Sequence, residues 1–135
     1  MKHNVIASSF ADLEDLRKFK ECIAKGKTEK QCFKVGDNGI GFTGLACASD
    51  KRCYCALPPD DWKPKWGSKS KASGKEVAVT FKGKRVVGKL GDTMPAKTNI
   101  TNGAGIDLNP GFAKAFGEKP PFMLKNVEWE WVDEE

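Results

Sequence analysis

The sequence predicts a mainly β protein, a small barrel or sheet that follows a helical N-terminal extension. Two strand-like runs, 76–81 and 84–90, meet at Lys82-Gly83, a residue pair typical of a hairpin turn. Near the C-terminus, apolar and acidic residues alternate over 127–131, which is the two-residue period of a half-buried strand. Helical spacing of apolar residues is confined mainly to the first 24 residues.

The chain of 135 residues is long enough for one domain with one core. We expect residues 1–34 to form the helical extension and residues 35–135 to form the barrel domain. No apolar run approaches the roughly 20 residues that cross a bilayer, so no membrane span is predicted.

The first element is an amphipathic helix over about residues 10–24, which Ser8 or Ser9 caps and Gly26 ends. Its apolar residues recur at steps of three and four: Phe10, Leu13, Leu16, Phe19, Cys22 and Ile23. Thr28 and Gln31 form a capping box that opens a second short helix. Two helical pieces that meet at Gly26 bring Cys22 near Cys32, so we expect a disulfide, with two buried thiols as the alternative.

Helix signals are absent from Val35 until Asn109, which caps a helix whose first residue is Pro110 and whose end is marked by Gly117. A very short strand at 106–108 comes before this helix, and the last strand follows Pro120-Pro121.

The net charge is +5, and its distribution is uneven. A stretch rich in Pro, Gly and Ser contains five lysines: Lys63, Lys65, Lys69, Lys71 and Lys75. The C-terminus, in contrast, is acidic, with Glu128, Glu130, Asp133, Glu134 and Glu135. We interpret the lysine stretch as a solvated loop or as a contact for an anionic polymer. It carries no nucleic-acid-binding motif, so nucleic acid is not expected as a partner.

The only histidine, His3, lies in a terminus that we expect to fray, which argues against Ser-His-Asp and Cys-His mechanisms. The five cysteines contain no C-x-x-C pair, so no metal site is predicted. Residues 39–44 satisfy G-x-G-x-x-G, but no amphipathic helix follows them. We therefore predict no cofactor.

Five cysteines in a short chain fit a compartment that permits disulfides. The apolar segment near the N-terminus is only Val5-Ile6-Ala7, which is too short for a signal peptide. Three explanations stay open: an export signal removed earlier, another route of export, or reduced cysteines. We expect a periplasmic, secreted or virion-associated protein.

The order of motifs from Val77 to Val132 resembles the double-psi β-barrel shared by rare lipoprotein A, barwin, expansins, family 45 endoglucanases and the catalytic domain of lytic transglycosylase A. The matching motifs are Asp92-Thr93-Met94-Pro95, Ile106-Asp107-Leu108-Asn109 and Phe116-Gly117 before the closing strand. The likeness covers about the last 60 residues closely and extends weakly to an opening strand at 39–44 and to Ala56-Leu57-Pro58. It implies a six-stranded double-psi β-barrel.

The resemblance implies that Asp107 is a catalytic acid that protonates a glycosidic oxygen. Asp92 is the best second carboxylate. The alternatives are a helix-terminus anchor for Asp107 and a turn-forming role for Asp92. The chain departs from relatives of rare lipoprotein A because it lacks their arginine between the Asp and Pro of the first motif and their upstream histidine.

Four further residues are candidates for substrate binding: Trp62, Trp66, Thr43 and Asn109. Trp62 and Trp66 lie in the lysine-rich stretch and are predicted to stack on sugar rings. Trp129 and Trp131 alternate on a strand and are predicted to belong to the core.

These observations predict a monomer that acts on peptidoglycan or another β-linked polysaccharide. The first hypothesis is cleavage of the glycan in the manner of a lytic transglycosylase. The alternatives are an expansin-like binding module without catalysis and a structural component of a phage or envelope assembly.

Overall fold

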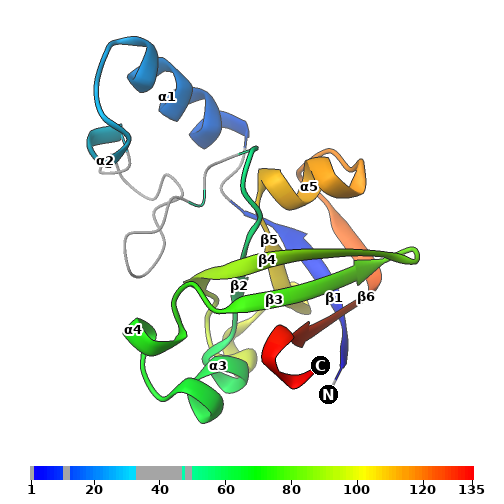
Figure 1. Ribbon diagram of the computed structural model, residues 1–135. Coiled ribbons are helices and arrows are strands. Elements are labelled where there is room, and N and C mark those ends of the chain that lie inside the picture. Colours follow the sequence, from blue (N-terminus) through cyan, green and yellow to red (C-terminus); the bar gives the residue numbers. More distant parts are fainter. Residues whose placement is uncertain (1, 11–12, 33–46, 48–49) are drawn as a thin grey trace.

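The structure, a computed structural model, describes residues 2–10, 13–32, 47 and 50–135, and its main feature is a closed barrel of six strands. The strands follow one another around the barrel in the order β1-β5-β2-β4-β3-β6 (Figure 1). Their bounds are β1 (His3–Ser9), β2 (Tyr54–Leu57), β3 (Glu76–Phe81), β4 (Lys84–Thr93), β5 (Ala104–Leu108) and β6 (Met123–Trp131). The pairs β1/β5 and β2/β4 are parallel and the other four pairs are antiparallel. The predicted mainly β, six-stranded barrel is confirmed.

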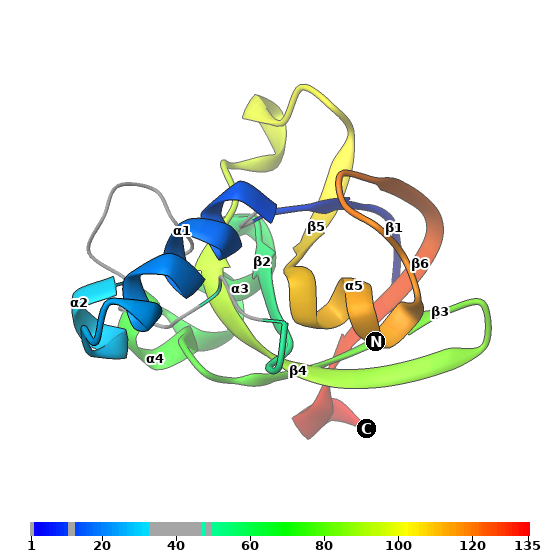
Figure 2. The same cartoon turned by 90° about the horizontal axis from the view of Figure 1, so that it is seen from above.

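Short helices surround this barrel. They are α1 (Leu13–Ala24), α2 (Glu29–Cys32), α3 (Pro59–Trp66), α4 (Lys69–Ala72), α5 (Pro110–Phe116) and the two 3-10 turns η1 (Lys97–Asn99) and η2 (Val132–Glu134). Helix α5 lies over one end of the barrel, α3 and α4 lie at the opposite end, and α1 and α2 lie to one side (Figures 1 and 2). In the described residues, no helix is long and apolar enough to cross a membrane.

The core fills the barrel with the alternate residues of its strands. Val77 and Val79 on β3 and Val127 and Trp129 on β6 are at most 1% exposed, as the two-residue period requires. Phe112 on α5 is fully buried and closes one end of this core. The prediction that Trp129 and Trp131 are core residues is confirmed.

The predicted hairpin turn and the predicted caps of the helix that begins at Pro110 are confirmed. Strands β3 and β4 join at Lys82 and Gly83, whose φ angles of 50° and 81° are those of a two-residue hairpin turn. Asn109 accepts a hydrogen bond from the Phe112 amide at the start of α5, and Gly117 ends that helix in the left-handed region.

The N-terminal segment differs from the prediction, because His3–Ser9 is strand β1 of the barrel and not part of a helical extension. This strand pairs with β5, about a hundred residues away in the chain, and with β6. His3 is not in a frayed end, since its ring stacks on Trp129 at 4.2 Å between centroids. Ser8 lies in the strand and does not cap a helix. The barrel therefore begins at His3 and not at residue 35.

Most of the lysine-rich stretch lies in the two short helices α3 and α4, although no helix was predicted there. Pro59 occupies the first turn of α3, and the side chain of Ser68 caps α4 by accepting from the Lys71 amide. The ammonium group of Lys65 lies 3.1 Å from Asp133 and 2.7 Å from Glu134. The C-terminal carboxylates thus neutralise part of the lysine cluster, which was interpreted as a solvated loop or as a contact for an anionic polymer.

The predicted disulfide is confirmed, since Cys22 on α1 is bonded to Cys32 on α2. Thr28 and Gln31 form the expected capping box between these helices, with hydrogen bonds in both directions. Cys47, Cys53 and Cys55 are free thiols.

Changing Cys22 and Cys32 to Ser is expected to lower the free energy of local opening of α1 and α2 by about 2–3 kcal/mol, because the bond restricts the loop between these two residues when the segment unfolds. We expect hydrogen exchange to accelerate in α1 and α2, which lie beside the barrel wall, and to change little in β3 and β6. Mass-spectrometric hydrogen exchange measures both effects. Equal acceleration throughout the barrel would contradict this prediction.

Candidate functional site

The two carboxylates selected from the sequence lie in one row across three strands. Asp107 on β5 and Asp92 on β4 both pair with Ala56 on the intervening strand β2. Strands lie about 4.8 Å apart, so the backbones of the two aspartates are separated by roughly 10 Å. Cys55 and Leu57, on either side of Ala56, lie in the barrel core, whereas Ala56 packs outside it against Met94 and Ala104. The row therefore faces the outside of the barrel wall.

A fourth residue, Ser8, extends this row on the other side of Asp107. Ser8 on β1 pairs with Asp107, is 7% exposed, and donates its hydroxyl hydrogen to the Asp107 carboxylate. From the sequence, Ser8 is predicted only as a helix cap. No motif singled it out for this position, because the pairing of β1 with β5 depends on a contact 99 residues apart.

The surroundings of Asp107 favour its protonated form. Burial raises the pKa of this carboxyl above its usual range, the hydrogen bond from Ser8 opposes that shift, and the negative charge of Asp92 adds to it. The pKa values of four other carboxyl groups are shifted downward instead: Asp50, Asp60, Glu134 and Glu135. Asp107 is thus suited to hold a proton at a higher pH than an exposed aspartate does.

Asp92 has a different environment. Its carboxylate accepts a hydrogen bond from the backbone amide of Thr93 at 2.8 Å. This hydrogen bond to the backbone of the next residue is the kind of contact expected of the turn-forming alternative for Asp92. The negative charge of Asp92 is one cause of the raised pKa of Asp107.

Asp107 opens into a cavity of about 240 Å³ between the barrel wall and the loop that follows β4. The cavity is lined by Ser8, Ser9, Met94, Pro95, Asn99, Ile100, Thr101, Asn102 and Asp107. Hydroxyl and amide groups predominate around the carboxyl, so the cavity offers hydrogen bonds to a polyhydroxylated ligand.

Asn109 is not a ligand-binding residue, which corrects the sequence prediction. Its side chain is fully buried, accepts hydrogen bonds from the amides of Tyr54 and Phe112, and donates to the carbonyls of Cys47 and Arg52. All four hydrogen-bonding positions of the amide are therefore used within the protein. Asn109 joins α5, β2 and the segment before β2.

Trp62 is likewise not a stacking platform. It is 4% exposed, belongs to the barrel core, and donates its indole N–H to the Thr93 hydroxyl at 3.1 Å. Proline within α3 obscured the helical spacing that directs Trp62 inward. The ring of Trp62 on α3 helps to close the end of the barrel opposite α5 (Figure 1).

Trp66 is half-buried and meets protein groups where the sequence predicted a sugar. The ammonium groups of Lys65 and Lys75 lie 5.0 Å and 4.7 Å from its ring centroid, and Trp131 packs edge-on at 5.6 Å. Trp66 lines a separate cavity of about 580 Å³ with residues of β3 and the C-terminus. The structure therefore does not bring Trp66 together with Asp107 in one cavity.

Thr43 and the opening strand predicted at 39–44 lie outside the described residues. The described thiols are poor nucleophiles, because burial raises the pKa of Cys47, of Cys53 and of Cys55. In the described part of the chain, no three His, Cys, Asp or Glu side chains gather as a metal site.

The raised pKa of Asp107 is expected to make the free energy of unfolding depend on pH. The folded state holds the Asp107 proton more tightly than the unfolded chain does. The favourable contribution of Asp107 is therefore complete below the unfolded pKa, about 3.9, and is lost as the pH rises through the folded pKa. Asp107→Asn removes this loss, so the free energy of unfolding of the variant should rise relative to that of the wild type as the pH increases.

Urea denaturation of both proteins between about pH 3 and pH 7 measures this difference, in which the other carboxyl groups cancel. A difference that does not change with pH would show that the Asp107 pKa is not raised.

Fold and site together define a small six-stranded barrel protein with a protonatable aspartate at the outer wall, beside a polar cavity. The structure is similar to Streptomyces papain inhibitor, with a TM-score of 0.56 and 16% sequence identity over 98% of this chain and 94% of that chain. This likeness shows the fold over nearly the whole length of both chains. No family model and no curated protein matches the sequence.

Proposed function

We propose that this protein binds a β-linked polysaccharide of the peptidoglycan type at the Asp107 cavity and cleaves it with Asp107 as the general acid. The observation that carries the proposal is the state of the Asp107 carboxyl: it is partly buried, accepts from Ser8, has a raised pKa, and opens into a cavity lined by hydroxyl and amide groups. A general acid must carry its proton at the pH of the reaction, and a raised pKa favours that protonation state.

In the proposed reaction, the Asp107 proton moves to the glycosidic oxygen as the bond from that oxygen to the anomeric carbon breaks. The 6-hydroxyl of the same sugar closes onto the anomeric carbon and gives its proton to the Asp107 carboxylate. Asp107 is thereby restored, and the products are a chain with a 1,6-anhydro end and a chain with a free hydroxyl. This route needs no enzyme nucleophile, in agreement with the raised pKa values of the buried thiols Cys47 and Cys55.

Digestion of insoluble peptidoglycan by the wild-type protein, followed by mass spectrometry of the soluble products, tests this proposal. Products with 1,6-anhydro ends support transglycosylase chemistry, and products with reducing ends support a glycosidase. Sedimentation with the polysaccharide without any cleavage would leave the expansin-like binding module and overturn the catalytic role of Asp107.

Inhibition of a papain-like protease is a second candidate function. The supporting observation is that the fold of Streptomyces papain inhibitor matches nearly the whole of this chain. Papain activity measured against a peptide substrate, with and without this protein, tests this candidate directly. Undiminished papain activity at a large excess of the protein would exclude it.

Either function fits a periplasmic, secreted or virion-associated protein. The Cys22–Cys32 bond supports such a location, since disulfides persist in oxidising compartments. A structural role in a phage or envelope assembly requires the same exposure to the cell wall.

A further inference from the structure

A second depression lies next to the Asp107 cavity, at a place where strand β1 is irregularly paired on both sides. Ile6 pairs with Ala104 and Ala7 with Ile106, so Gly105 is an extra residue on β5. On the other side, Val5 pairs with Val127 and Ala7 with Leu124, so Lys125 and Asn126 are both opposite Ile6. Each neighbour of β1 thus carries a β-bulge at the same level of the barrel.

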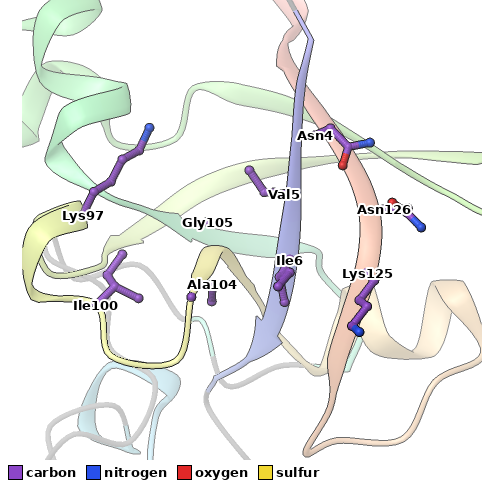
Figure 3. Close-up of a pocket in the computed structure, with 10 residues that line it drawn as sticks. Asn4, Val5, Ile6, Lys97, Ile100, Ala104, Gly105, Lys125 and Asn126 are labelled. Atoms are coloured by element: carbon purple, nitrogen blue, oxygen red, sulfur yellow. The ribbon is translucent and has the colours of Figure 1, made fainter.

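The two bulges open a groove of about 550 Å³, shown in Figure 3. We call it the bulge groove. Val5, Ile6, Ile100 and Ala104 make up its apolar lining. Its polar residues are Asn4, Lys97, Lys125 and Asn126, which lie at its edges in Figure 3.

The shape of the groove depends on two backbone positions. A Cβ atom on Gly105 would lie 2.6 Å from Val5 Cγ1, so only glycine allows β1 to lie this close to β5. Asn126 has a φ of 59°, a left-handed conformation that asparagine tolerates better than most residues do. Bulges often re-aim side chains beside functional sites.

The groove lies next to the Asp107 cavity, because Ile100 lines both. A chain of sugar units that enters the cavity on one side of Ile100 therefore has the groove on the other side. The groove is larger than the cavity and has room for a further unit.

The charges at the groove favour an anionic occupant. Among its ten described lining residues, two are lysines and none is acidic. Lys97 is already engaged, with its ammonium group 3.0 Å from Asp61. Lys125 on β6 is exposed, and Asn126 beside it offers amide donors. An ammonium and an amide donor can together form charge-assisted and neutral hydrogen bonds to one carboxylate.

We infer that the bulge groove binds a carboxylate-bearing sugar unit of the polysaccharide, next to the unit held at Asp107, and that Lys125 selects the carboxylate. The apolar lining of Ile6 and Ile100 contacts the carbon face of the ring, and Lys125 with Asn126 contacts its acid group. This inference rests on the proposed function for the nature of the ligand, but its test does not need cleavage.

The test uses the Asp107→Asn protein, so that no cleavage interferes, and a short β-linked oligosaccharide of alternating glucuronate and N-acetylglucosamine. The same oligosaccharide with its carboxyl groups reduced to alcohols is the comparison ligand. Calorimetric titration is expected to give about tenfold weaker binding of the reduced ligand, the loss of one charge-assisted contact. Lys125→Glu should weaken binding of the intact ligand by about tenfold or more and leave binding of the reduced ligand unchanged.

Lys119→Glu is the matched control, because Lys119 is exposed and lies outside the groove while the change in net charge is the same. Lys125→Arg keeps the positive charge and should bind the intact ligand about as strongly as the protein with Lys125. Equal affinities for the two ligands, or equal losses in the Lys125 and Lys119 variants, would overturn the inference. Carboxylate-selective binding by a protein whose wild type cleaves no glycan would support the groove and refute the catalytic proposal. Cleavage by the wild type without carboxylate-selective binding would support the catalytic proposal and refute the inference about the groove.

Discussion

Asp107→Asn is expected to reduce glycan cleavage by at least the roughly 10²–10⁴-fold that general acid catalysis contributes. The amide has nearly the same size as the carboxyl and still accepts a hydrogen bond from Ser8, but it has no acidic proton to transfer. The binding of insoluble polysaccharide should therefore change little, and near neutral pH the melting temperature should not fall below that of the wild type, because the cost of ionising Asp107 is removed. Release of soluble products, measured by mass spectrometry against the wild type at equal protein concentration, gives the loss of rate.

Asp92→Asn is the informative companion variant. Removal of the Asp92 charge is expected to lower the pKa of Asp107, because that charge is one of the two causes that raise it. Cleavage should persist, and its decline on the alkaline side should begin at a lower pH than in the wild type. Cleavage by Asp107→Asn at the wild-type rate would show that Asp107 serves only as a structural residue.

The local signals in the sequence were sufficient for the hairpin at Lys82-Gly83 and for the α5 caps at Asn109 and Gly117. Each of these depends on residues within a few positions of one another, where propensity and capping chemistry act directly. The disulfide between Cys22 and Cys32 was predictable for the same reason, since a short capped turn separates them.

Strand β1 was not predictable in this way. Residues His3–Ser9 contain a short apolar run with no adjacent turn, and both strands that pair with β1 lie far along the chain. Its position follows from long-range pairing, which no local pattern encodes. The same pairing brings Ser8 to Asp107, so the missed strand also concealed a residue of the candidate site.

The adjacency of the two aspartates also depends on tertiary structure. Asp92 and Asp107 were selected separately, from motifs fifteen residues apart, and they lie in one row because both pair with Ala56 of the short strand β2 between them. The sequence roles of Trp62 and Asn109 were wrong for a related reason. Both are polar or amphipathic residues near the motifs, and their burial is decided by packing that spacing alone does not reveal.

The burial of Asn109 leads to the largest expected effect on stability. Asn109→Ala deletes four hydrogen bonds and leaves the amides of Tyr54 and Phe112 and the carbonyls of Cys47 and Arg52 without these partners. An unsatisfied buried polar group costs about 1–3 kcal/mol. We expect the variant to lose at least about 3 kcal/mol of its free energy of unfolding, or roughly 10 °C in melting temperature.

Urea denaturation of Asn109→Ala against the wild type measures this loss, and Asn99→Ala, in the exposed turn η1, is the matched control with an expected change within about 0.5 kcal/mol. Asn109→Ser keeps an acceptor for the Phe112 amide but is too short to bridge to β2. It should therefore recover only the capping contribution, about 1 kcal/mol. A loss below about 1 kcal/mol in Asn109→Ala would mean that water replaces the amide, and that Asn109 is not what holds α5 against β2.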